Sequence, residues 1–448
     1  MKIEPVKQTL DLPKVVETNK KKSKDKWKAY GLIAPALILI LAVSIWPVIQ
    51  SFYFSLFDLE LNSPTKSEAH LKYSFDLERY LDSYPFLIGG IDQEIRNNHA
   101  PDQLGKLKAN LEALDKQIQT DPDIKDNYKL VNDKLMNYQS VDDSIGIVKM
   151  NKNLALSVQK TADSVSKEIG AINKTTKLDQ GTKLQGLATG ISQTVIKPNF
   201  VGIQHYIDNL TNPRFWSSLK NTAIFTVISV FFETILGLGI ALLINKAFVG
   251  RGLIRATILI PWAIPTAVSG YIWKFLYDGQ NGVVALIFQK LGIVHNMADL
   301  LTSPAGAMFS VIFSDVWKTT PYMALLLLAG LQTIPESLYE AASIDGAGKW
   351  KQFTSITLPL LKTSLLVALL FRTLDAFRVF DLIYVLTGGG PANGTETVSL
   401  YAYKTMFSEM DFGNGSALSV LVFICIAIIS MIYIKFLGKD LLGDGAGK

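Results

Sequence analysis

The chain has 448 residues, of which 49% are hydrophobic and only 19% are charged, and its formal net charge is +5. A typical soluble protein has about 25% charged residues. Here the charges are bunched, because residues 58–200 hold 20 Asp and Glu and 18 Lys and Arg. Elsewhere, residues 29–57 and 412–434 carry no charge at all, and each stretch exceeds the roughly 20 residues that cross a bilayer core. This distribution excludes a single soluble globule and predicts a membrane protein with several spans.

Residues 1–28 form a basic tail with nine lysines, six of them between residues 20 and 28. An anionic inner leaflet attracts such a cluster beside a span, so the positive net charge does not predict nucleic-acid binding. Residues 29–57 are too long for a cleaved signal peptide, and we expect a retained span. Cys425 is the single cysteine and the four histidines show no ligand spacing, so neither a metal site nor a cofactor is predicted.

Hydropathy predicts six spans, at residues 30–57, 219–245, 254–276, 305–333, 358–388 and 413–437. The tails and short loops on one side of these spans carry 18 Lys and Arg, whereas the short loops on the other side carry three. The positive-inside rule therefore places both termini, including the tail 441–448, in the cytoplasm. The fold class predicted is an all-α polytopic membrane protein, with span one at 29–57 and the remaining five spans within 201–440.

The charged segment 58–200 is expected outside the cell, as an insert between the first two spans. Apolar residues recur there at alternating spacings of three and four, in residues 104–118, in 124–138 and more loosely in 154–172. This spacing is typical of amphipathic helices. Because Asp121-Pro122 interrupts the register, we expect a mostly helical bundle rather than one long coiled coil. Docking of an extracellular partner and a spacer role both remain open.

A more specific pattern occupies the cytoplasmic segment 336–362, which we call the coupling loop. It contains a short alanine-rich helix, a turn at Gly346 that permits positive φ, and a second helix that enters the fifth span. The pattern resembles the signature loop of ABC importer permeases, in which this loop forms a coupling helix in a groove of the ATPase subunit. The resemblance implies a coupling role for Glu340, Ala341, Ala342, Asp345, Gly346, Leu358 and Pro359.

A second pattern, Leu-Thr-Gly-Gly-Gly-Pro at residues 386–391, precedes Thr395-Glu396-Thr397. No Gly-Lys-Ser/Thr follows the glycines, which argues against a phosphate-binding loop. The segment resembles the loop after the fifth core helix of maltose-type carbohydrate permeases. The resemblance extends over residues 25–57 and 200–440. It implies a second homologous permease, two ATP-binding cassette ATPase subunits and an extracellular sugar-binding protein as partners.

Seven ionisable residues fall within the predicted spans. Each is costly in lipid, so each is expected to face the bundle interior or a watery cavity. Asp315 and Lys318 are spaced three residues apart, as are Arg372 and Asp375, so the members of each pair share a helix face. This arrangement fits either a substrate site or mutual neutralisation. Glu233 has no such neighbour and is expected to be structural. The seven residues are Glu233, Asp315, Lys318, Arg372, Asp375, Arg378 and Asp381.

Aromatic residues interleave with these charges in the fourth and fifth spans, and a cavity lined by both types suits a polar ligand. In the maltose-type family these two spans build most of the substrate cavity. The resemblance therefore implies substrate contacts at Trp317, Thr319, Tyr322, Arg372 and Asp375, to which we add Arg378. At positions 372 and 375 this chain has Arg and Asp, where the maltose-specific pattern has uncharged or aromatic residues. The expected substrate is therefore an oligosaccharide, maltodextrin-like or another multiple-sugar compound, without commitment to maltose.

Together these patterns predict the permease subunit of an ATP-driven ABC importer, which forms half of a translocation pathway in the lipid of a bacterial inner or plasma membrane. No Walker motif, His-Glu-x-x-His or Ser-His-Asp set occurs, so no catalytic residue is predicted and ATP hydrolysis belongs to separate subunits. The alternatives are an ion-coupled secondary transporter, an ABC permease for a non-sugar polar solute, and a membrane-anchored adhesin or sensor. Dependence of uptake on an ATPase separates the importer from the secondary transporter.

Overall fold

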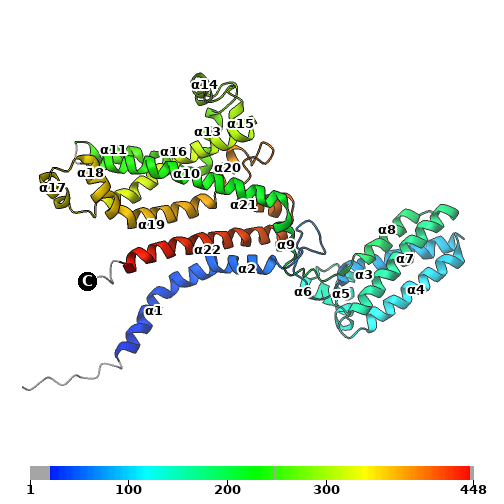
Figure 1. Cartoon of the computed structure of the whole chain (residues 1–448). Coiled ribbons are helices and arrows are strands. Elements are labelled where there is room, and N and C mark those ends of the chain that lie inside the picture. The colour runs from blue at the N-terminus through cyan, green and yellow to red at the C-terminus, as the bar shows by residue number, and fades with distance from the viewer. Residues whose placement is uncertain (1–20, 247–248, 444–448) are drawn as a thin grey trace, which may run out of the picture. The chain divides into compact units, whose positions relative to one another are not determined.

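The computed structural model describes residues 21–246 and 249–443, and helices account for most of them (Figure 1). The all-α fold class is confirmed. The predicted tails fall partly beyond this range, since residues 1–20 and 444–448 lie outside the described residues. Residues up to Tyr53 form one compact unit and residues from Phe54 onward form another, and the two are described separately.

The first unit contains the predicted first span. Its described residues form α1 (Lys21–Ile40), a π-helical segment (Leu41–Ile45) and all of α2 (Trp46–Phe54) except its last residue, Phe54. The stretch Tyr30–Phe54 is 25 residues long with a mean hydropathy of 2.6, which is sufficient to cross a bilayer.

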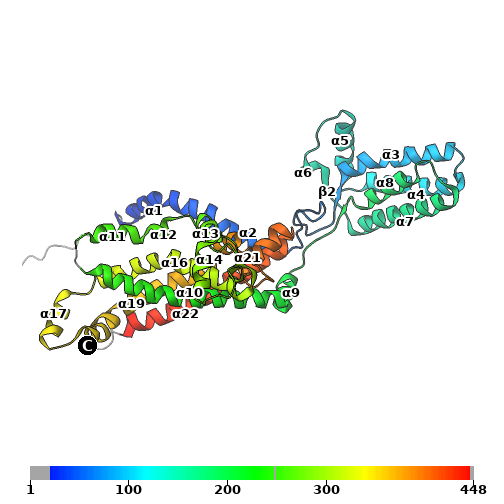
Figure 2. The same cartoon turned by 90° about the horizontal axis from the view of Figure 1, so that it is seen from above.

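The insert combines a bundle of helices with a small antiparallel sheet. Strand β1 (Ser74–Asp76) is central and pairs with β2 (Ile147–Lys149) and β3 (Val195–Ile196), so that Phe75 lies opposite both Val148 and Val195. The helices α3, α4, α7 and α8 lie side by side (Figure 2). The helices of the insert are α3 (Leu77–Arg96), α4 (Pro101–Thr120), α5 (Lys125–Met136), α6 (Asp143–Gly146), α7 (Lys152–Thr176) and α8 (Gly181–Ser192).

The apolar stripes predicted for the insert form its core. On α4, Leu104, Leu107, Leu111, Leu114 and Ile118 are each at most 4% exposed. Burying a leucine side chain contributes about 1.5–3 kcal/mol relative to leaving it exposed, so this one stripe is a major source of stability for the bundle.

One carboxylate is buried beside the α4 stripe. Asp115 accepts hydrogen bonds from the hydroxyls of Tyr80 at 3.0 Å and Tyr128 at 2.8 Å. Burial raises the pKa of both tyrosines, which keeps their hydroxyl groups protonated as donors. The three residues therefore join α3, α4 and α5 through a satisfied polar contact.

Four long helices of the second unit, α10, α16, α19 and α22, run beside one another (Figure 1). Among the described residues, Pro213–Asn245, Lys349–Phe377 and Phe412–Phe436 are long and apolar enough to span a membrane, as is the helix of the first unit. Helix α16 has 28 residues, about 42 Å of length, although Asp315 and Lys318 lie inside it. The bounds are α10 (Pro213–Asn245), α16 (Pro304–Leu331), α19 (Leu358–Phe377) and α22 (Phe412–Gly443).

Two predicted spans differ in form from the expectation of one continuous helix. Residues 254–276 are divided among α11 (Arg251–Ile258), α12 (Ile260–Ala263) and α13 (Thr266–Leu276). The chain leaves helical geometry at Ile264, with ψ of 131°, because a residue that precedes proline disfavours the α conformation. Residues 358–388 are also divided, since α19 ends at Phe377 and α20 (Asp381–Leu386) begins anew with an acid in its first turn, where the helix dipole favours negative charge.

Shorter helices complete the second unit, and two of them, α17 and α18, belong to the coupling loop. These are α9 (Gln204–Thr211), α14 (Val283–Lys290), α15 (Asp299–Thr302), α17 (Glu336–Ile344), α18 (Lys349–Gln352) and α21 (Val398–Tyr403), with π-helical segments at Phe353–Thr357 and Lys404–Ser408.

Both ends of the insert are held at its base by backbone hydrogen bonds. The amide of Asp58 donates to the carbonyl of Asn199 at 2.8 Å, and the amide of Val201 donates to that of Leu56 at 2.8 Å. The base also joins the start of α22, where the amide of Phe412 donates to the carbonyl of Leu59 at 2.8 Å. The chain therefore enters and leaves the insert at one point.

Candidate functional site

Arg372 is the centre of a charged cluster within the helices. Its side chain is 1% exposed on α19. The guanidinium forms a two-pronged contact with Glu233, in which Nη2 donates to Oε1 at 2.9 Å and Nε donates to Oε2, and Nη2 also donates to Oδ2 of Asp315. Glu233 lies on α10 and Asp315 on α16. One buried cation therefore ties three helices together.

Glu233 is the residue of this cluster whose partners the sequence did not reveal. It is fully buried, and its Oε1 also accepts a hydrogen bond from the hydroxyl of Thr319 at 2.6 Å. Its contact with Arg372 joins residues 139 positions apart, and spacing along one helix cannot report such a contact. The charge of Arg372 could have indicated such a contact, because a guanidinium that is buried among helices requires carboxylate partners.

Lys318 does not pair with Asp315, although the two residues are three positions apart. Its Nζ donates to the carbonyls of Ile264 at 2.6 Å and Trp262 at 3.4 Å. Both carbonyls lie at the break between α12 and α13. Lys318 therefore satisfies backbone groups where the predicted third span is interrupted, as irregular backbone at membrane depth requires.

The charged cluster becomes exposed toward the end of α19. Asp375 Oδ2 lies 3.3 Å from Arg372 Nη1, and its Oδ1 accepts from Arg378 Nη2 at 3.2 Å. The side chains of Asp375 and Arg378 are 53% and 68% exposed. These two groups remain accessible to a ligand, whereas Arg372 is occupied by protein partners.

A cavity of about 300 Å³ opens onto this cluster. Four of the six predicted substrate residues, Thr319, Arg372, Asp375 and Arg378, line it. The cavity therefore combines residues of α16 and α19. The rest of the lining consists of Thr266, Asp315, Lys318, Val379, Phe380, Asp381 and Leu382.

The other two predicted substrate residues, Trp317 and Tyr322, do not line this cavity. The ring of Trp317 packs edge-on against Trp273 with centroids 5.3 Å apart, because position 317 lies on another face of α16. Tyr322 lies one turn beyond Thr319 and stacks on Trp262 at 5.5 Å. Tyr322 therefore packs beside the α12–α13 break, whereas Trp317 packs against the last turns of α13.

Aromatic residues outside the predicted set of substrate contacts lie next to the cavity. Phe380 lines it and also lines a second cavity of about 280 Å³. Its ring stacks on Tyr384 with centroids 5.3 Å apart and contacts Tyr403 at 4.8 Å. Tyr384 is 48% exposed. An accessible aromatic surface therefore adjoins the charged cavity.

The coupling loop has the predicted helix–turn–helix form. Gly346 has φ of +77° directly after α17, and Gln352 Nε2 donates to Ser343 Oγ at 2.8 Å across the turn. Glu340, Ala341 and Asp345 are exposed, Ala342 is half-buried, and Leu358 and Pro359 occupy the first turn of α19. Ile344 and Trp350 are 87% and 77% exposed. Apolar side chains in this position are typical of a surface that another protein covers.

The glycine-rich loop at 386–391 is held by an ion cluster. Glu396 is fully buried, and it accepts hydrogen bonds from Arg214 Nε at 2.9 Å and Lys404 Nζ at 2.9 Å. Burial opposes its ionisation, but these two cations hold the pKa of Glu396 below its ordinary value. Arg214 lies in the first turn of α10 and Lys404 follows α21, so the two ion pairs of Glu396 connect the segment after the glycines to both helices.

One group in the insert has donors suited to a metal ion: Glu94, His99 and Asp179. Both oxygens of Glu94 are already engaged, since they accept the backbone N–H groups of Gln180 at 2.6 Å and Asp179 at 3.2 Å. His99 Nδ1 lies 2.7 Å from Glu94 Oε2. The arrangement is that of a carboxylate that caps the start of α8.

Residues 233–442 match the family model described as a binding-protein-dependent transport system inner membrane component. The matched range begins at Glu233 and includes Arg372, the coupling loop and Glu396, whereas the insert lies outside it.

Curated relatives resemble the chain over about half of its length. It is 49% identical over 236 residues to the trehalose/maltose transport system permease protein MalF of Thermococcus litoralis, covering 53% of this chain and 79% of that protein. It is 43% identical over 239 residues to the trehalose transport system permease protein SugA of Mycobacterium tuberculosis, covering 53% and 75%. It is 41% identical over 238 residues to the sulfoquinovosyl glycerol transport system permease protein SmoG of Agrobacterium fabrum, covering 53% and 77%.

Proposed function

Because this chain belongs to the family of binding-protein-dependent transport system inner membrane components and is a multi-pass permease subunit of an ABC importer, we propose that the solute it admits is a carbohydrate. The observation that carries the proposal is the cavity between α16 and α19, where accessible charged groups adjoin an aromatic ring. The relatives named for trehalose, maltose and sulfoquinovosyl glycerol support the same substrate class.

Within the cavity, Asp375 and Arg378 are the proposed ligand contacts. Both are more than half exposed, and the carboxylate and guanidinium offer acceptors and donors to sugar hydroxyls. Arg372 positions Asp375 through its Nη1 at 3.3 Å, and Phe380 supplies an apolar face for the C–H side of a sugar ring. Thr319 lies deeper and is hydrogen-bonded to Glu233. Tyr322 packs on Trp262 beside the α12–α13 break, whereas Trp317 packs on Trp273 of α13.

The remaining partners are proposed from the coupling loop. We propose that an ATPase subunit contacts the coupling loop at Glu340, Ala341, Ala342, Asp345, Gly346, Leu358 and Pro359. This contact would place the coupling loop in the cytoplasm, and both termini would lie on the same side. The exposed Ile344 and Trp350 support this contact. A second homologous permease would complete the pathway, two ATPase subunits would drive it, and an extracellular sugar-binding protein would deliver the substrate to it.

The test is uptake by the assembled transporter in proteoliposomes, with its binding protein, across a panel of di- and oligosaccharides. Asp375→Asn and Arg378→Gln should each reduce uptake of the accepted sugar about tenfold, since a hydrogen bond to a charged group contributes about 1.5–3 kcal/mol. Basal ATPase activity should persist. Lys274→Gln, an exposed position that does not line the cavity, is the matched control.

Two outcomes would contradict the proposal. Uptake that continues without the ATPase and stops with a protonophore would identify an ion-coupled transporter. If no sugar of the panel is taken up but another polar solute shows saturable uptake, the transporter is an importer of that solute.

A further inference from the structure

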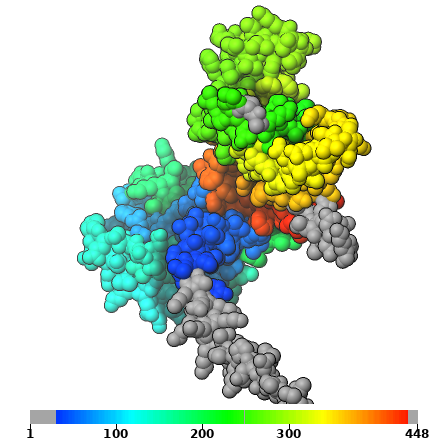
Figure 3. Space-filling model, turned by 90° about the vertical axis from the view of Figure 1, so that its left-hand side faces the viewer, coloured from blue at the N-terminus to red at the C-terminus, as the bar shows by residue number. Residues whose placement is uncertain are grey.

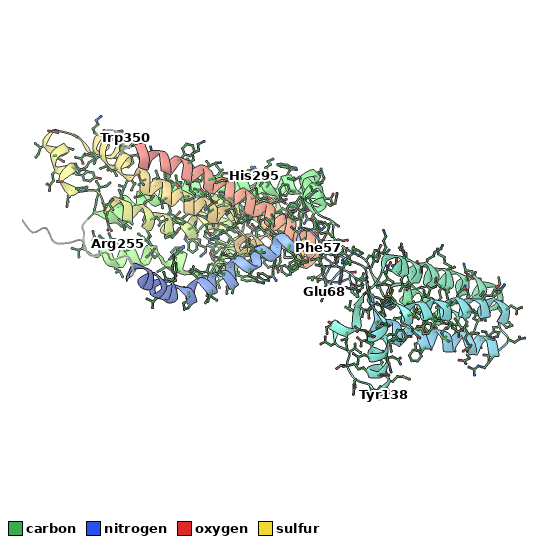
Figure 4. The ribbon with its side chains drawn as sticks, turned by 90° about the horizontal axis from the view of Figure 1, so that it is seen from below. Phe57, Glu68, Tyr138, Arg255, His295 and Trp350 are labelled. Atoms are coloured by element: carbon green, nitrogen blue, oxygen red, sulfur yellow. The ribbon has the colours of Figure 1, made fainter. Side chains whose placement is uncertain are left out.

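A third and larger cavity lies beside the coupling loop, at one end of the long helices. Its volume is about 860 Å³. Figure 1 places α11, α17 and α18 together at this end, Figure 3 shows it facing the viewer, and Figure 4 labels Arg255 and Trp350 there. Three cations line the cavity: Lys246 after α10, Arg251 at the start of α11 and Lys349 at the start of α18. Glu336 is the one carboxylate of the lining.

The three cations are not neutralised by the part of the chain that the structure describes. None of the three forms an ion pair with a described residue. The guanidinium of Arg251 donates a long hydrogen bond, 3.5 Å from its Nη1 to the uncharged carbonyl of Asn245. Lys246 and Lys349 are exposed. Three like charges around one hollow repel one another and create a positive potential that attracts an anion.

The cavity lies where membrane spans end. Asn245 is the last residue of the span Pro213–Asn245, and Lys349 is the first residue of the span Lys349–Phe377. Both residues line the cavity. The cavity therefore adjoins the ends of two helices that are long and apolar enough to span a membrane, and we infer that lipid headgroups surround this end.

Part of the wall of this cavity is apolar. Leu242 lies one turn before the end of α10, Leu331 ends α16, and Phe353 follows α18. Cations at headgroup depth beside apolar walls match a ligand with an anionic head and hydrocarbon chains.

We propose that this cavity binds the phosphate headgroup of an anionic phospholipid such as phosphatidylglycerol. Because Glu336 and Tyr339 of α17 and Trp350 of α18 belong to the same lining, the lipid joins the α10–α11 connection to the coupling loop. The proposal rests on the proposed function only in assigning this face to the cytoplasmic leaflet.

The test uses the assembled transporter in nanodiscs that contain phosphatidylcholine alone or mixed with phosphatidylglycerol, followed by native mass spectrometry of retained lipid. Phosphatidylglycerol should be retained in preference to phosphatidylcholine. Lys246→Gln, Arg251→Gln and Lys349→Gln should each weaken retention about fivefold, since one basic residue near an anionic surface contributes about 1 kcal/mol. Lys351→Gln, an exposed lysine of α18 outside the cavity, should leave retention unchanged.

A second variant tests the sign of the effect. Glu336→Gln removes the one carboxylate of the lining and should strengthen retention of phosphatidylglycerol. Thermal unfolding with short-chain phosphatidylglycerol or with inorganic phosphate identifies the source of the anion, and stabilisation by the lipid alone is expected.

The proposal is overturned by equal retention of the two lipids, by equal stabilisation with inorganic phosphate, or by unchanged retention in the triple Lys246→Gln, Arg251→Gln and Lys349→Gln variant. Displacement of the lipid whenever the ATPase subunit is bound would assign the cavity to a protein segment instead. Lipid retention is measured without transport, so a failure of sugar uptake leaves this result standing.

Discussion

Arg372 illustrates how a guanidinium is accommodated among membrane helices. It is covered on its inner side by Glu233 and Asp315 and reaches Asp375 at the edge of the cavity. Breaking a buried ion pair from one side costs about 3–5 kcal/mol, because the remaining charge has no partner. In this cluster two buried carboxylates depend on the same cation.

Arg372→Leu should therefore lower the stability of the assembled transporter by roughly 3–5 kcal/mol, read as a fall in the temperature at which the detergent-solubilised protein unfolds. Adding Asp375→Leu should not restore stability, because Glu233 and Asp315 remain buried without a cation. Adding Glu233→Gln and Asp315→Asn should restore part of it. Asp375→Asn alone is the control and should unfold near the wild-type temperature, since its side chain is 53% exposed. Rescue by Asp375→Leu would show that Arg372 and Asp375 form a self-contained pair.

At the scale of elements, the coupling loop depends on one backbone conformation. Gly346 has φ of +77° and a Cβ at this position would meet no atom within 4 Å, so the cost of a side chain there is conformational rather than steric crowding by neighbours. The turn sets the angle between α17 and α18, and with it the surface formed by Ile344 and Trp350.

Gly346→Val should therefore reduce ATP-coupled uptake at least tenfold while the protein remains inserted, since a β-branched residue held at positive φ costs about 1–3 kcal/mol. Gly346→Asn should be milder, because asparagine adopts this region more readily. The measurements are uptake and binding-protein-stimulated ATPase activity at matched expression. If the two variants were equally active, positive φ would not be the reason why this position requires glycine.

At the scale of the whole molecule, the insert is a folded body with its own core. The α4 stripe is buried against other insert helices, and hydrogen bonds at the base bring Leu56–Asp58 and Asn199–Val201 together. Removal of residues 66–197 therefore leaves two ends that are already adjacent, and the remaining helices should still assemble with the partner permease.

Leu111→Asp places an unpaired charge in that core and should unfold the insert, with protease cleavage confined to residues 58–200. Asn110→Asp, at the exposed neighbouring position, is the control and should resist cleavage. The excised variant is then tested for assembly and for stimulation by the binding protein. Failure to assemble would assign the insert a structural role, whereas assembly without stimulation would assign it to docking.

The sequence by itself determined the fold class, the presence of a helical insert and the coupling-loop pattern. These depend on local or repeating signals: apolar length, a spacing of three and four residues, and a glycine turn. Leu104–Ile118 became a buried stripe because periodicity places such residues on one helix face. Arg372, Asp375 and Arg378 were predicted to face inward because charge at membrane depth is costly in lipid, whereas Thr319 was predicted from the family resemblance alone.

Only the tertiary structure decided which charges meet. Glu233 lies 139 residues from Arg372, and Lys318 serves carbonyls 54 and 56 residues away rather than its neighbour Asp315. It also decided that Trp317 packs on Trp273 and Tyr322 on Trp262, and that Lys246, Arg251 and Lys349 share one cavity. Contacts between helices depend on how the helices pack and rotate against one another, and the periodicity of a single helix carries no information about its neighbour.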